Sequence, residues 1–196
     1  MTSRLWLVPL FLAVSLSAAQ EDSEDLFPRV EMQTSAGRIV VELDRTRAPL
    51  TVANFLQYAN DGFYDGTVIH RIVADFVVQG GGFTPDFDEK DTRDPVVNES
   101  GNGLSNMRGT LAMARTNDPH SATAQFFFNL ADNTRLDPSA ARWGYAVFGR
   151  VVEGLEVVER IGRMPTGPGG PFDSEVPQST VLIEKVRVLA RPVPAE

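Results

Sequence analysis

Alternating apolar and polar residues along the chain predict a protein built mainly from short β-strands. Two such segments, residues 30–34 and 38–43, flank Ser35-Ala36-Gly37, and this arrangement is typical of a hairpin. Clusters of Gly, Pro, Asn and Asp separate six further strand-like segments, which lie at residues 68–72, 76–79, 110–115, 125–130, 146–151 and 181–189. Many short strands with turn residues between them favour a closed barrel or a sandwich.

Two other segments have the period of an α-helix. In residues 49–59 apolar side chains recur at the i, i+3, i+4 and i+7 spacing of one buried face. Pro49 suits the first helical turn, where its missing N–H costs little, and Asp61-Gly62 ends the segment. A second, shorter helix is predicted at residues 155–161, before a glycine and a proline. Two helices among so many strands predict a barrel whose open ends the helices cap, since those ends expose apolar side chains.

The first 19 residues have the layout of an export signal. Arg4 gives the positive start, residues 5–16 the apolar run, and Ser17-Ala18-Ala19 the small-residue cleavage site. The apolar run is too short to span a membrane, and the acidic stretch that follows disfavours an uncleaved anchor or a buried helix. We therefore expect a periplasmic or secreted protein, cleaved near Ala19. Its expected parts are a signal peptide (1–19), an acidic flexible lead-in (20–29), one folded domain (30–190) and a C-terminal tail (191–196).

Composition narrows the class of partner and excludes several kinds of site. The formal net charge of −8 disfavours nucleic acid and anionic membranes, so we expect polypeptide partners and no stable membrane association. We also expect a monomer. The chain has no cysteine and only His70 and His120 as histidines, which disfavours a zinc site of the usual ligands and a Ser-His-Asp triad. We expect no metal and no organic cofactor.

Two further clusters favour a structural interpretation over a functional one. The glycines at 80–82 lack the Lys-Ser/Thr pair that follows in a phosphate-binding loop, so a turn or bulge is preferred. Asp86, Asp88, Glu89 and Asp91 lack the glycine and the distal glutamate of an EF-hand loop. A solvated loop is therefore preferred over a calcium site.

One arginine and two glutamines stand among apolar residues of the predicted strands. They are Arg71, Gln79 and Gln125, and the segments around them are rich in Phe and Val. Alternating Phe and Val normally form a core, so composition alone leaves ordinary core strands with one snorkelling arginine as an equally good interpretation.

A longer and more specific pattern covers residues 68–83. This segment contains His70-Arg71-Ile72, then Phe76, then Gln79-Gly80-Gly81-Gly82-Phe83, and it resembles the cyclophilin signature F-H-R-[VI]-x-x-x-F-x-x-Q-G-G-[DG]-F. The likeness continues in the same order through residues 109–114, 121–127, 136–137 and 147–151. The chain thus resembles cyclophilin-type peptidyl-prolyl cis-trans isomerases, and exported bacterial members in particular, over about residues 30 to 190.

The resemblance implies a mainly β fold, a closed eight-stranded antiparallel barrel capped by two α-helices, with a groove on its outer surface. It implies an enzyme that accelerates rotation about X–Pro bonds in exported or folding polypeptides. The alternative function is a non-catalytic chaperone or scaffold that binds proline-containing peptides. A match at the family's catalytic arginine, Arg71, disfavours this alternative.

The resemblance also assigns roles to individual positions. Arg71 matches the catalytic residue. By the same resemblance, the proline pocket comprises Phe76, Val77, Phe127 and Leu136. The substrate-binding positions also include Gln79 and Gln125, which orient the peptide, and Ala114, which lies beside it. Met113, one place earlier in an alternating strand, should point into the core instead.

The far side of the implied groove departs from the pattern of many eukaryotic members. Arg135 stands where they have the Trp that donates a hydrogen bond to the inhibitor cyclosporin, and Tyr145 stands where they have His. Both are counted among the substrate-binding positions. Arg115 replaces an Asn whose backbone contacts the substrate, so its side chain is expected to matter little.

The chemistry of the implied reaction suits an arginine. Rotation about an X–Pro bond breaks amide resonance and gives the prolyl nitrogen a lone pair, which a permanently charged guanidinium stabilises. The reaction transfers no proton obligatorily, so a hydrogen-bonded structural role is favoured for His70 over acid–base catalysis.

Overall fold

The computed structural model describes residues 25–190. The predicted signal peptide, the first half of the predicted lead-in (20–24) and the predicted tail lie outside these residues.

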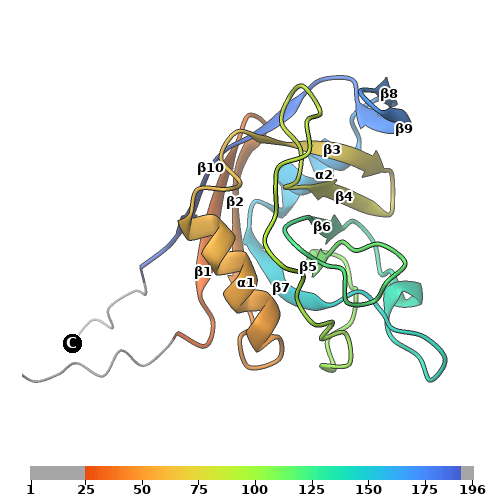
Figure 1. Ribbon diagram of the computed structural model, residues 1–196. Coiled ribbons are helices and arrows are strands. Elements are labelled where there is room, and N and C mark those ends of the chain that lie inside the picture. Colours follow the sequence, from red (N-terminus) through yellow and green to blue (C-terminus); the bar gives the residue numbers. More distant parts are fainter. Residues whose placement is uncertain (1–24, 191–196) are drawn as a thin grey trace, which may run out of the picture.

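Within the described residues, eight strands close into an antiparallel barrel (Figure 1). Around the barrel the strands follow the order β1-β10-β3-β4-β6-β5-β7-β2, and every neighbouring pair is antiparallel. The strands are β1 (Arg29–Thr34), β2 (Gly37–Leu43), β3 (Thr67–Val73), β4 (Val77–Gly80), β5 (Thr110–Met113), β6 (Phe126–Asn129), β7 (Val147–Glu153) and β10 (Val181–Val188). The predicted fold class is confirmed.

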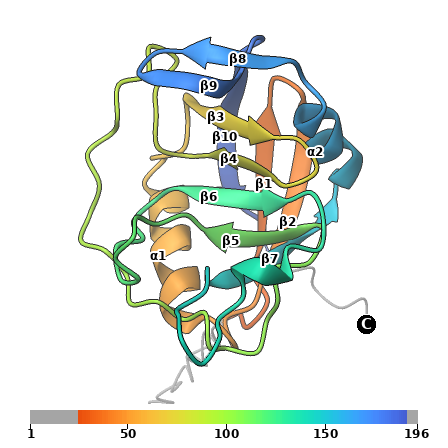
Figure 2. The same cartoon turned by 90° about the vertical axis from the view of Figure 1, so that its right-hand side faces the viewer.

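Two helices, α1 (Pro49–Asn60) and α2 (Leu155–Gly162), lie on opposite sides of the strands (Figure 2). Both bury an apolar face in the barrel core. Pro49 stands in the first turn of α1, as predicted. The Glu99 carboxylate accepts hydrogen bonds at 3.1 and 2.8 Å from the backbone N–H groups of Leu50 and Thr51, which have no partner within the helix. No helix within residues 25–190 is long and apolar enough to cross a membrane.

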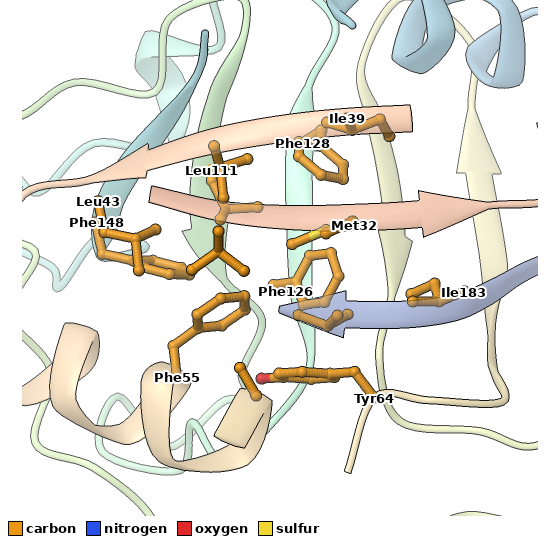
Figure 3. Close-up of a cluster of buried hydrophobic side chains, with 14 of the residues drawn as sticks. Met32, Ile39, Leu43, Phe55, Tyr64, Leu111, Phe126, Phe128, Phe148 and Ile183 are labelled. Atoms are coloured by element: carbon orange, nitrogen blue, oxygen red, sulfur yellow. The ribbon is translucent and has the colours of Figure 1, made fainter. Parts of the chain in front are cut away.

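Aromatic rings fill the inside of the barrel (Figure 3). Phe55 of α1 contacts Tyr64, Phe126 and Phe148, with ring centroids 5.1 to 5.8 Å apart. All four side chains are fully buried. Because the interior is packed with side chains, a peptide can bind only on the outside of the barrel.

One hairpin was missed by the sequence pattern. Strands β8 (Thr166–Gly169) and β9 (Phe172–Pro177) form a separate two-stranded sheet, which lies beside β3 outside the barrel (Figure 2). The sequence analysis assigned no strand between the predicted helix at 155–161 and the segment at 181–189. A short 3-10 helix, η1 (Thr134–Leu136), was also not predicted.

Candidate active site

The groove lies on the outer face of the barrel, where alternation along the strands leaves apolar side chains outside the main core. In β6, Phe126 and Phe128 belong to the main core, whereas Phe127 between them belongs to a second cluster. In β5, Met113 lies in the main core, as predicted. We call the second group the outer cluster; it contains Val77, Ala112, Phe127 and Val147, with Val73, Phe76, Leu104, Ala114, Leu136 and Tyr145 packed against it.

Arg71 reaches this face from β3. The register of β3 against β4 shifts between Ile69 and Arg71, and such a β-bulge re-aims the side chains next to it. After the shift Arg71 is the direct partner of Gln79 on β4. Directly opposed residues of antiparallel strands share one face, so both side chains line the groove.

Hydrogen bonds link the polar side chains along this edge of the groove. Arg71 donates from Nε to Oε2 of Glu175 at 2.7 Å and from Nη1 to Oε1 of Gln79 at 3.3 Å. Gln79 donates from Nε2 to Oε1 of Gln125 at 3.0 Å, and Gln125 makes a longer contact of 3.5 Å to Glu89. The guanidinium is therefore held in place without a substrate.

The groove has a volume of about 220 Å³. Its floor is buried even when empty, because Phe127 is only 4% and Val77 only 2% exposed. The ring of Tyr145 meets Phe127 edge-on, with the centroids 5.6 Å apart. Sites for drug-sized ligands are usually ~300–1,000 Å³, so this groove suits a single small apolar group.

Two arginines lie at the rim. The guanidinium carbon of Arg135 lies 4.4 Å from the ring centroid of Phe76, and that of Arg115 lies 4.5 Å from the ring centroid of Tyr145. Arg115 also donates to the backbone carbonyls of Thr116, Trp143 and Gly144. The Arg115 side chain is among the residues that line the groove.

The pocket wall at Leu136 is anchored by the next residue, Asp137. The Oδ1 atom of Asp137 accepts hydrogen bonds from the backbone N and the Nδ2 of Asn106, both at 2.8 Å, and its Oδ2 accepts one from the Ser105 hydroxyl. Burial raises the pKa of Asp137, but the hydrogen bonds from Ser105 and Asn106 outweigh it and hold the pKa below its usual value. The charged carboxylate thus fixes η1 against the barrel.

His70 lies away from the groove. Its ring is buried between Phe83 and Phe172, at centroid distances of 4.7 and 5.7 Å. Burial lowers the pKa of His70 to about 4, so the imidazole is neutral at physiological pH. Its Nδ1 has no hydrogen-bond partner in the described part of the chain, whereas a hydrogen bond with the backbone of Val68 partly opposes the lowering of the pKa.

The acidic loop is exposed at Asp86, Asp88 and Glu89. Among residues 25–190, no group of three or more His, Asp or Glu side chains is arranged to hold a metal ion.

The structure brings the predicted site residues to one place. The groove is lined by Arg71, Phe76, Val77, Gln79, Ala114, Arg115, Phe127, Leu136 and Tyr145. Gln125 and Arg135 are not part of this lining, but they contact it through Gln79 and Phe76 respectively. The sequence offered no sign of Glu175, which lies 104 positions from Arg71 in the unpredicted hairpin.

Comparisons with known proteins identify the family of this chain. The family model described as cyclophilin type peptidyl-prolyl cis-trans isomerase/CLD matches residues 29–188. The chain is 54% identical over 163 residues to peptidyl-prolyl cis-trans isomerase cyp18 of Streptomyces antibioticus, a match covering 82% of this chain and 98% of that protein. It is 49% identical over 162 residues to peptidyl-prolyl cis-trans isomerase B of Escherichia coli K12, covering 81% and 98% respectively.

A solved structure shares the fold. The cyclophilin type peptidyl-prolyl cis-trans isomerase of Cryptosporidium parvum superposes with a TM-score of 0.72 at 24% identity, over 85% of this chain and 99% of that one. The fold and the groove define a closed-barrel protein with an external binding site. The chain belongs to the cyclophilin-type peptidyl-prolyl cis-trans isomerase family, and it is an enzyme of that activity.

Proposed function

We propose that Arg71 is the catalytic residue and that the outer groove holds the proline of the substrate. The observation that carries this proposal is the position of Arg71 on the wall of a small apolar groove, with its guanidinium already fixed by Glu175 and Gln79. As the X–Pro bond twists, the prolyl nitrogen becomes pyramidal and gains a lone pair. A guanidinium aimed at that nitrogen stabilises the twisted state more than the planar one.

The apolar wall supplies the other half of the mechanism. Phe76, Phe127 and Leu136 bury the proline ring, so that one side of the amide bond is held while the other rotates. The uncatalysed barrier of about 18–20 kcal/mol gives times of tens to hundreds of seconds. Turnover at roughly 1 to 10³ per second requires a barrier lower by about 3–7 kcal/mol, which a preorganised charge in a site shielded from water supplies.

Replacing Arg71 tests this mechanism. We expect Arg71→Ala to lose at least about tenfold in kcat/KM with the fold intact, and Arg71→Lys to recover only part, because it keeps the charge without the planar fork. Arg150→Ala is a matched control, since Arg150 is exposed and pairs with Glu42 of β2, outside the groove lining. Isomerisation is measured by NMR exchange on a short proline peptide.

The same variants separate the enzyme from the alternative of a non-catalytic binding protein. Binding of the peptide should survive Arg71→Ala, because the apolar wall is unchanged, while turnover falls. Full turnover by a well-folded Arg71→Ala protein would contradict the mechanism.

We further propose that the enzyme is a monomer that acts in the periplasm or outside the cell. Its substrates there are exported polypeptides. The proposal rests on the sequence of residues 1–19, where a basic start, an apolar run and small residues at 17 and 19 follow one another. Mass spectrometry of the exported protein should find a chain beginning at Gln20. An intact Met1 on that protein would rule out cleavage there. Sedimentation of the mature chain tests whether the protein is a monomer.

A further inference from the structure

A hairpin outside the barrel brings a carboxylate to the catalytic arginine. Glu175 of β9 accepts a hydrogen bond from Nε of Arg71 at 2.7 Å. The hairpin lies beside β3 (Figure 2). The ring of Phe172 holds it there, because it stacks on His70 at 5.7 Å and meets Phe83 edge-on at 5.4 Å. Three contacts therefore fix the carboxylate relative to the strand that carries Arg71.

The backbone at Glu175 is unusual for its residue type. Its φ is 68°, in the left-handed region that glycine and asparagine adopt most readily. A long side chain in this conformation is strained, and such strain persists where the surrounding structure or a function maintains it. A glycine would satisfy the backbone here but would carry no carboxylate.

Stability of the fold does not account for the pair. The side chains of Arg71 and Glu175 are 38% and 40% exposed. Ion pairs with this exposure contribute little to the free energy of unfolding, because water screens them and two long side chains lose freedom. We therefore expect the ion pair to affect the groove, which Arg71 lines, and not the stability of the fold.

We propose that Glu175 is a positioning residue for the isomerase reaction, acting through Arg71. This inference rests on the proposed role of Arg71. A guanidinium has five N–H groups, and Glu175 and Gln79 take one each, on Nε and Nη1. These two contacts fix the plane of the fork and leave three N–H groups for the substrate. Without Glu175, the arginine samples several rotamers, and only a fraction of the molecules present it correctly to the twisted bond.

Glu175→Gly distinguishes positioning from a structural role. This change removes the carboxylate and relieves the backbone strain, so we expect the melting temperature to stay within about 2 °C of wild type or to rise. We expect kcat to fall about 3- to 10-fold, the usual range for one lost hydrogen bond, with KM changed less than about twofold because the apolar wall binds the proline ring.

Two more variants complete the design. Glu175→Gln keeps an oxygen that accepts from Nε, so we expect it to retain more than half of the wild-type kcat. Glu153→Gln is the control, because it removes the same charge from an exposed pair with Arg38, a residue of β2 outside the groove lining. It should leave both kcat and the melting temperature unchanged.

The double variant Arg71→Ala/Glu175→Gly gives the decisive comparison. If Glu175 acts through Arg71, then the double variant is no slower than Arg71→Ala alone. A kcat of Glu175→Gly within twofold of wild type, or a loss that persists in full on the Arg71→Ala background, would overturn the inference. Full turnover by Arg71→Ala would instead contradict the proposed function itself.

Discussion

Two neighbouring glycines, Gly81 and Gly82, should respond very differently to the same substitution by alanine. A Cβ at Gly82 would lie 2.5 Å from Cγ and 2.8 Å from Nε2 of Gln125. The Gln125 side chain can move, but moving it breaks the hydrogen bond from Gln79 that supports the edge of the groove. A Cβ at Gly81 would instead lie 2.6 Å from the ring of Phe126, which is fully buried and cannot move.

The magnitudes follow from these contacts. For Gly82→Ala, a shifted Gln125 rotamer costs about 0.5–1.5 kcal/mol and the lost hydrogen bond a similar amount, partly offset by about 0.4–1 kcal/mol from a less flexible unfolded chain. The net destabilisation is then about 0–2.6 kcal/mol. Gly81 has a φ of 83°, so Gly81→Ala adds a left-handed penalty of about 1–2 kcal/mol to an overpacking cost of about 1–3 kcal/mol.

Thermal unfolding and isomerisation rates together test this reasoning. At about 2–4 °C per kcal/mol, Gly82→Ala should lower the melting temperature by at most about 10 °C and Gly81→Ala by about 4–20 °C. At a temperature where both variants are folded, Gly82→Ala should still lose about 2- to 10-fold in kcat/KM, because Gln79 has lost its support. Equal destabilisation by the two substitutions, or full activity of Gly82→Ala, would refute the argument from these contacts.

Two further predictions concern the inhibitor and pH. The hydrated guanidinium of Arg135 lies over the ring of Phe76, so cyclosporin should bind weakly. Arg135→Trp should tighten binding about 30-fold in calorimetry, a gain of about 2 kcal/mol, and equal affinities would show that this position does not control binding. Burial lowers the pKa of His70 to about 4, whereas an exposed histidine has a pKa of about 6.5. Between these two pH values the imidazole takes up a proton in the unfolded chain but not in the folded one. Stability should therefore fall between about pH 6.5 and 4, by at most about 3 kcal/mol, and denaturant titrations should show a smaller fall in His70→Phe.

Much of the barrel could be predicted because alternating side chains and flanking turn residues indicate its strands in the local sequence. The turn at Ser35-Ala36-Gly37 joins β1 and β2 as expected, and Gly37 has the positive φ of 136° that such a turn needs. The run Phe126-Phe127-Phe128 was assigned to a strand, and its alternation separates one groove residue from two core residues. The boundaries were less accurate, since β5 ends at Met113 and not at residue 115.

The site was predicted through the resemblance, which assigned even Leu136 of the unpredicted η1. Phe76, Gln79 and Phe127 lie in or beside marked strands, and the resemblance assigned them together. Glu175 could not be found, because its contact with Arg71 joins positions 104 residues apart through a hairpin rich in proline and glycine. Such segments have weak strand propensity, and the fold of the hairpin depends on packing against His70 and Phe83.

The shallow groove on a filled barrel also limits how long a substrate stays bound. Burying one proline ring contributes only about 2–3 kcal/mol, since each buried CH₂ contributes about 0.8 kcal/mol, and this is less than even millimolar affinity requires. A groove that binds the proline ring this weakly releases both isomers quickly. The site thus suits brief binding of proline-containing peptides, and the enzyme gains no advantage from holding any one of them for long.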